Sequence, residues 1–171
     1  PPAADDARVA VVEVVEPDPQ GSGSVATNGL VTTYGYDTLG GLTNVWQDVQ
    51  TRSFRYDSLG RLTHQKLAER LATLNDNGQF VTSGGTWSDV FTYDDRSNPT
   101  SRVDARGVKT VFSYADDPLN RLQSVSFDTT GFGDTAHPIV ASPTISYAYM
   151  ATGDLTRLSS VTTANVSTES F

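Results

Sequence analysis

The chain of 171 residues has no cysteine, which excludes disulfide bonds, thiolate metal sites and cysteine nucleophiles. It has no apolar run near the roughly 18 residues of a transmembrane helix, and no basic, apolar leader opens it. Basic residues are also scarce: 12 Lys and Arg stand against 20 Asp and Glu, a net charge of −8. Nucleic-acid binding needs a basic surface, so we expect neither nucleic acid nor a heparin-like polyanion as a partner.

Helical periodicity is nearly absent as well. Only the window 65–74 places leucines at helical spacing, at Leu67, Leu71 and Leu74. For this window we favour an irregular connection or a single helical turn. The pattern therefore predicts an all-β chain.

What the sequence does contain is a short phrase that recurs. Its core is an aromatic residue, any residue, Tyr-Asp, two variable residues, Gly, one further residue and a Leu-Thr pair. Such self-similarity indicates a repeat architecture. The five copies are Tyr34–Thr43, Phe54–Thr63, Phe91–Thr100, Phe112–Leu122 and Tyr147–Thr156.

The copies are spaced in an alternating way. The second aromatic residue of each copy marks its position. Between successive copies this residue advances by 20, 37, 21 and 35 positions, so alternate copies lie 57, 58 and 56 residues apart. The larger unit is therefore a pair of hairpins, one with a tight connection and one with a long connection.

Each part of the phrase has a physical reason. Two aromatics separated by one residue lie on one face of a strand. An Asp that accepts a backbone N–H begins a turn, and Gly three residues later supplies positive φ. We therefore expect Gly40 and Gly60 at positive φ, with Asp37 and Asp57 bonded to turn amides. The segment Asp104–Gly107 has the same turn chemistry at the opposite end of a hairpin.

The phrase resembles the YD repeat of the RHS (rearrangement hot spot) family. The segments FRYDSLGRLTH, DARGVKTVFSY and NGLVTTYGYDTLGGLTNV carry the resemblance. It implies antiparallel β-hairpins that coil into a hollow shell, as in bacterial toxin carriers and animal teneurins. The repeat positions that we expect to be structural are Tyr36, Asp37, Gly40, Tyr56, Asp57, Gly60, Arg61, Tyr93, Asp94, Tyr114, Tyr149 and Gly153.

Three stretches organise the chain. Residues 1–27 combine a β-prone segment, Val9–Val15, with a Pro/Gly/Ser-rich link. Residues 28–156 form the hairpin array, with long insertions at 66–90 and 128–143. Residues 157–171 begin a further strand or repeat, and we expect both terminal segments to be ordered by more of the same protein.

Candidates for chemistry are few, and no cofactor or metal is expected. His64 and His137 are the only histidines, and nothing in their spacing pairs them. The acidic pairs 94–95 and 116–117 fall at turns, where we interpret Asp as a backbone cap rather than as an acid or base. Asn75–Gly78 begins like a calcium loop but lacks the later ligands, so a plain turn is favoured.

Two short motifs have conditional meanings. Asp18–Gly21 matches the four letters of the Asp-Pro-x-Gly motif that the family resemblance links to self-cleavage, but it precedes the repeats rather than closing them. Asn165–Ser167 has the form of a glycosylation site and is meaningful only in a glycosylating secretory route.

The repeated rings leave two interpretations open. We favour an aromatic ladder that buries one face of the sheet, with Tyr36, Tyr56, Tyr93, Tyr114 and Tyr149 in equivalent places and Leu42, Leu62 and Leu122 on the same buried side. The alternative is a sugar-stacking platform. Trp46 and Trp87 lie outside the phrase and are the better candidates for stacking on a sugar.

These observations favour a structural function. The expected role is a shell wall or self-assembling scaffold of a large secreted or surface protein, with further repeats or copies of the same protein as partners. The alternatives are a module that binds carbohydrate or a cell surface, and the encapsulating part of a toxin-delivery protein around an enclosed polypeptide. An enzyme is not expected, because no nucleophile–base pair, metal set or phosphate loop is visible.

Overall fold

The computed structural model describes residues 12–16, 30–114 and 117–171. These residues form twelve β-strands, and every pair of strands with a described register is antiparallel. The predicted all-β fold of antiparallel hairpins is confirmed. The window 65–74 has no helix and, as favoured above, is mostly an irregular connection. In the described part of the chain no helix is long and apolar enough to cross a membrane.

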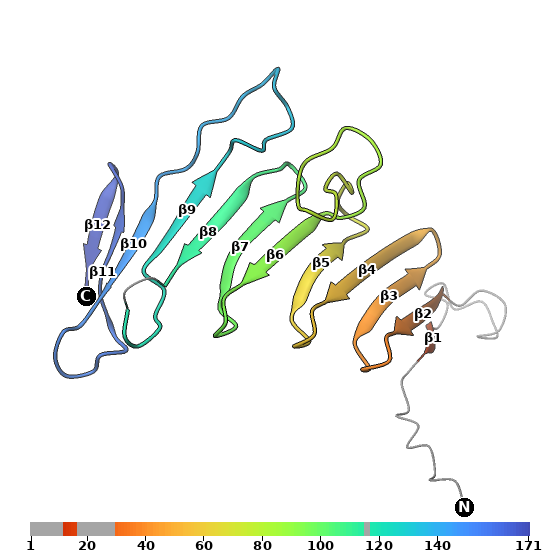
Figure 1. The fold of residues 1–171 in the computed structure, drawn as a ribbon, viewed down its shortest axis with the longest axis horizontal. Helices are drawn as coiled ribbons and strands as arrows, with labels where there is room; N and C mark the ends of the chain where they lie inside the picture. The colour runs from red at the N-terminus through yellow and green to blue at the C-terminus, as the bar shows by residue number, and fades with distance from the viewer. Residues whose placement is uncertain (1–11, 17–29, 115–116) are drawn as a thin grey trace, which may run out of the picture. The chain divides into compact units, whose positions relative to one another are not determined.

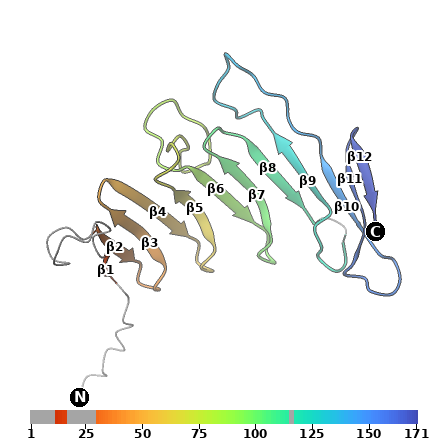
Figure 2. The ribbon, with the colours of Figure 1, turned by 180° about the vertical axis from the view of Figure 1, so that it is seen from behind.

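The strands divide between two compact units, Pro1–Leu71 and Ala72–Phe171. Within each unit, successive strands pair in sequence order (Figures 1 and 2). The first unit contains β1 (Glu13–Glu16), β2 (Leu30–Tyr36), β3 (Leu42–Gln47), β4 (Gln50–Tyr56) and β5 (Leu62–Lys66). The second contains β6 (Asp89–Tyr93), β7 (Pro99–Asp104), β8 (Lys109–Ser113), β9 (Ser124–Asp128), β10 (Ile145–Tyr149), β11 (Leu158–Thr163) and β12 (Ser167–Ser170).

The sheet of the first unit has two chemically different faces. Residues paired across an antiparallel ladder share a face, and alternate residues of a strand share it too. Tyr34 pairs with Val45, which pairs with Arg52, and Phe54 follows two residues later. We call this the aromatic face. The opposite, polar face carries Thr33, Asn44, Trp46, Thr51, Ser53, Arg55, His64 and Lys66.

The second unit repeats this division. Phe91, Phe112 and Tyr147 lie on one face, which is the aromatic face of this unit. The opposite, polar face is rich in hydroxyl groups, and some of them bond across strands, as Thr92 and Ser101 do at 2.7 Å. Its hydroxyl residues are Thr92, Ser101, Ser113, Ser124, Ser126, Ser146, Ser160, Thr162, Thr168 and Ser170.

A β-bulge recurs next to the second aromatic of the phrase. Gly35 pairs with Asn44 but Tyr36 pairs with Leu42, so Thr43 is an extra residue on the returning strand. Such a residue bends its strand and increases the local twist. At the next copy the hydroxyl of Thr63 donates to the carbonyl of Arg55 (3.1 Å). The equivalent extra residues are Thr43, Thr63, Thr100 and Ser159.

Four of the five tyrosines of the phrase end a strand in the expected way, each opposite a residue of the returning strand. Tyr36 and Tyr56 end β2 and β4 on the aromatic face, opposite Leu42 and Leu62. Tyr93 and Tyr149 end β6 and β10 in the same way. Tyr114 directly follows β8, and Leu122 precedes β9.

One alignment of the phrase is wrong. The sequence pattern places the return of the fifth copy at Leu155-Thr156, but Tyr149 pairs with Leu158, where β11 begins. The turn in this loop is made by Asp154, whose carbonyl accepts from the amide of Arg157 (3.1 Å). Gly153 has φ 77° but precedes this Asp, so it is not equivalent to Gly40 or Gly60.

Hydrophobic burial concentrates where the first insertion folds back on the second unit. Leu74, Trp87 and Val90 form a buried cluster, with Phe80 and Val103 packed against it. Val90 and Val103 pair across β6 and β7 on the polar face. In the first unit the only buried residue among those described is Thr32. That unit is therefore held by its strand ladders and turns rather than by a core.

The second insertion meets the first at the turn Asp104–Gly107. The amide of Gly133 donates to the carbonyl of Arg106 (2.9 Å). From the first insertion, Thr73 donates to the carbonyl of Ala105. A Cβ at Gly107 would lie 1.9 Å from the carbonyl oxygen of Gly131. The two insertions thus converge on one turn, and that turn requires glycine.

This packing predicts different losses of stability for substitutions at two glycines. A Cβ added at Gly60 (φ 76°) would have nothing within 4 Å, whereas one added at Gly107 (φ 82°) would meet backbone. We expect Gly60→Ala to cost about 1 kcal/mol through left-handed strain alone. Gly107→Ala should cost about 1–3 kcal/mol more, because the loop 128–143 must move away. Urea unfolding measures both, and equal losses would contradict the described loop contact.

Candidate functional site

Six turns in the described residues share one hydrogen-bond pattern. The first residue is Asp or Asn, and its carbonyl accepts from the amide three residues later. Its side-chain Oδ1 accepts from the amide two residues later and, in all but one, four residues later. The fourth residue always has positive φ. These turns begin at Asp37, Asp57, Asn75, Asp94, Asp104 and Asp117.

The predictions about these turns are confirmed. Gly40 has φ 84° and Gly60 has φ 76°, with Asp37 and Asp57 bonded to turn amides as expected. Where glycine is missing, Ser97 and Asn120 adopt φ 68° and 57°. The segment at Asn75 is a plain turn, and Asp104 begins the predicted turn at the opposite hairpin end.

The residue after the positive-φ position often adds a second bond to the carboxylate. The Arg61 guanidinium donates to Asp57 (2.7 Å), and the Asn98 amide donates to Asp94 (2.8 Å). The backbone amide and guanidinium of Arg61 hold the pKa of Asp57 below its usual range. The Asn98 side chain does the same for the pKa of Asp94. Arg61, which follows the glycine of the phrase, thus stabilises the turn of its own repeat.

The turn at Asp117 also joins two hairpins. Its carboxylate is 1% exposed and accepts from Arg121 (2.8 Å) and Gln123 (2.7 Å). The Arg121 guanidinium lies 4.3 Å from the ring centroid of Tyr149, a cation–π contact, and donates to the carbonyl of Leu155. The hydroxyl of Tyr149 donates to the carbonyl of Leu122 (2.8 Å). These bonds connect the β8–β9 hairpin to the β10–β11 hairpin.

An amide pair connects the preceding hairpin in the same way. Asn98 donates to Asn120 (2.8 Å), and Asn120 donates back to Asn98 (3.1 Å). In the first unit the turns at Asp37 and Asp57 line a shared pocket with Tyr56. Burial, and then the nearby Asp37 carboxylate, raise the pKa of Tyr56. Neighbouring turns therefore contact one another within each unit.

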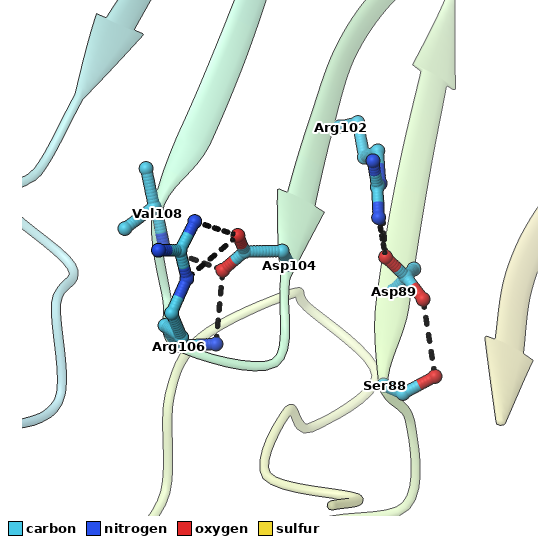
Figure 3. Close-up of polar contacts among 6 residues, drawn as sticks. All are labelled: Ser88, Asp89, Arg102, Asp104, Arg106 and Val108. Carbon is cyan, nitrogen blue, oxygen red and sulfur yellow. Dashed lines mark hydrogen bonds and ion pairs between the residues drawn. The ribbon is translucent and has the colours of Figure 1, made fainter. Parts of the chain in front are cut away.

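A buried carboxylate lies at the other end of the second unit's strands (Figure 3). Asp89 is fully buried, accepts from Arg102 (2.6 and 2.9 Å) and accepts from the Ser88 hydroxyl (3.1 Å). Asp89 is paired in register with Asp104, whose carboxylate binds Arg106. Like charges opposite one another are destabilising unless each is neutralised, and each Asp here has its own Arg. No sequence pattern indicates Asp89.

The two tryptophans occupy different environments. Trp46 lies on the polar face of the first unit, is 43% exposed and covers Gly35, whose Cβ would lie 3.0 Å from the indole. Trp87 is 6% exposed and donates its indole N–H to Asp76 (2.7 Å). Its buried position leaves no ring face for a sugar, which counts against Trp87 as a stacking residue. Trp46 alone of the two presents a surface ring.

The remaining candidates are not assembled into a catalytic group. His64 is in β5 beside the Thr63 hydroxyl (2.9 Å), and His137 is in the second unit, bonded to Asp134 (2.9 Å). Asp94 and Asp117 cap turns. In residues 12–16, 30–114 and 117–171 no three His, Asp or Glu side chains gather as metal ligands. Asp18–Gly21 and Asp116 lie outside the described residues.

The fold of this chain is similar to parts of solved toxin structures. No family model matches the chain, and no curated protein matches its sequence. Among solved structures, the TcdB2-TccC3 crystal structure aligns with 81% of this chain at TM-score 0.55 and 16% identity. A pore structure of the Photorhabdus luminescens Tc holotoxin with a TccC3 mutation aligns with 81% at TM-score 0.54 and 18% identity. The chain has an RHS/YD-repeat fold.

This similarity concerns the fold alone, because the identities are low. The chain spans 6% of the length of each of these toxin chains. The fold was predicted from the repeated phrase, and the residues of this phrase form the turns, the bulges and the aromatic face.

The turn carboxylates make stability depend on pH. Burial opposes ionisation of Asp117, but Arg121 and the turn amides hold its pKa below the usual range. A depressed folded-state pKa stabilises above the unfolded value of about 3.9, and this contribution is lost as pH falls through the folded-state pKa. Asp117→Asn, which keeps an acceptor for the Leu119 amide, should lower the melting temperature at neutral pH. The deficit should shrink as pH falls below about 4.

Melting temperatures measured from neutral pH to about pH 2.5 check this expectation. Asp95→Asn, at an exposed carboxylate within the turn that begins at Asp94, is the matched control and should leave the profile unchanged. A deficit for Asp117→Asn that is constant across this range would show that its charge is not what stabilises the turn.

Proposed function

We propose that this chain is a wall segment of a shell in a larger RHS/YD-repeat protein of the toxin-delivery type. One observation carries the proposal: a single layer of strands with one aromatic face and one polar face. A lone sheet of this kind leaves the rings of its aromatic face in water unless something encloses them. A coiled shell encloses it, with the aromatic face turned inward.

The fold neighbours support the same role. The aligned structures are of Tc toxin assemblies, and this chain corresponds to a small part of each aligned chain. The partners we infer are further repeats of the same protein, which extend the sheet at its edges, and a polypeptide held inside. In the described residues β12 pairs with β11 along one edge, and a further strand would fit the other. Such a protein would act outside the cell that makes it.

A carbohydrate- or cell-surface-binding module is the second candidate, and one observation favours it. Trp46 presents an exposed ring on the polar face, between its cross-strand partners Thr33 and Thr51. The indole already covers Gly35, which gives it a structural task in either case.

The shell proposal is tested with two adjacent threonines of β11. Thr162 pairs with Ser146 on the polar face, and Thr163 pairs with Ile145 on the aromatic face. The chain has no cysteine, so Thr162→Cys and Thr163→Cys each introduce a single label site. In the native polypeptide, a bulky polyethylene glycol maleimide should label Cys at 163 about tenfold more slowly than at 162.

The same two variants in the isolated 171-residue chain are the control. There both faces meet solvent, so the two rates should be similar. Equal rates in the native polypeptide as well would contradict an enclosed aromatic face.

A further inference from the structure

The two insertions build a cavity that a shell wall does not need. It has a volume of about 460 Å³ and lies over the polar face of the second unit. Its floor is made by β7, β8 and β9, and its sides by Phe80 from the first insertion and Gly131–Gly133 from the second. Gly107, in the turn where the insertions meet, also lines it. The volume is within the range of about 300–1,000 Å³ that is usual for small-ligand sites.

The cavity carries one cationic and one anionic side chain. Lys109 and Asp128 are cross-strand partners on β8 and β9. Oδ1 of Asp128 accepts from the amide and hydroxyl of Thr130 (2.9 and 2.7 Å), which orients the carboxylate. The cavity therefore offers a charged donor and a fixed charged acceptor side by side, without net charge.

The rest of the lining is neutral and partly aromatic. Gln79, Thr130 and Thr135 add amide and hydroxyl groups, and Phe132 and Phe80 add rings. Gly133 lies against the Phe80 ring, since its Cβ would be 2.2 Å from that ring. Glycine at this position thus brings the loop onto Phe80 and shapes the cavity wall.

We propose that this cavity binds a neutral saccharide. Sugar hydroxyls both donate and accept, so they match a lining that presents an ammonium, a carboxylate, an amide and hydroxyls. The apolar face of a sugar ring packs against an aromatic side chain such as Phe132. A phosphate or an acidic polymer is disfavoured, because Asp128 lies beside the single cation of the lining and the chain is acidic overall. This site is distinct from Trp46 and does not depend on the shell role.

The test uses the 171-residue chain and isothermal titration with four neutral oligosaccharides: cellohexaose, chitohexaose, maltohexaose and mannohexaose. A hyaluronan oligosaccharide is the acidic comparison. Lys109→Ala removes the donor, and Asp128→Asn removes the charge while keeping an acceptor for Thr130. Thr135→Trp fills the cavity. Lys66→Ala is the matched control, since Lys66 is the only other lysine and lies in β5. Circular dichroism checks that each variant is folded.

The proposal expects at least one neutral oligosaccharide to bind. Lys109→Ala and Thr135→Trp should each weaken that binding by about tenfold or more, and Lys66→Ala should leave it unchanged. The proposal is overturned if none of the four binds at millimolar concentration, or if binding survives in folded Thr135→Trp. It is equally overturned if hyaluronan binds more tightly, or if Trp46→Ala abolishes binding, which would place the sugar on the other unit.

Discussion

A sheet without a second layer has no interior to set the register of its strands, and this constraint governs the rest of the structure. In most β proteins a one-residue slip is penalised because apolar side chains leave the core. Here the described residues of the first unit bury almost nothing fully, so the register must be fixed locally. The turns do so: a carboxylate at Asp37 or Asp57 binds two amides of its own turn, and a bulge at Thr43 or Thr63 follows it. Each hairpin is therefore defined by its own sequence, which is what allows the phrase to repeat.

In the second unit, side-chain contacts between neighbouring hairpins add to the local turns and bulges. Arg121 binds Asp117, packs on Tyr149 and reaches the next loop, while Asn98 and Asn120 exchange amide bonds. These contacts lie at one end of the strands. At the other end the two insertions meet over the turn at Asp104 and supply the cluster around Leu74 that the sheet itself lacks. The sheet of the second unit is therefore stabilised at both ends of its strands.

Much of this is predictable from the phrase, since its residues act within a few positions of one another. Asp57 and Gly60 are three residues apart, so their turn follows from local chemistry alone. Contacts between distant segments cannot be predicted in this way. The pairing of Asp89 with Arg102 depends on strand register, and the burial of Trp87 depends on how the long connection between β5 and β6 folds back. In the fifth copy the sequence pattern predicts that the returning strand begins at Leu155. The strand begins instead at Leu158, which pairs with Tyr149.

Hydrogen exchange at the turn amides tests whether the turn carboxylates fix each hairpin. The amides of Gly41, Arg61, Asn98 and Val108 all donate to a side-chain oxygen of the Asp that begins their turn. We expect these amides to exchange as slowly as the central amides of the flanking strands at neutral pH. Exchange of the four amides at the rate of an unstructured peptide, beside protected strands, would show that the carboxylates do not fix the hairpins.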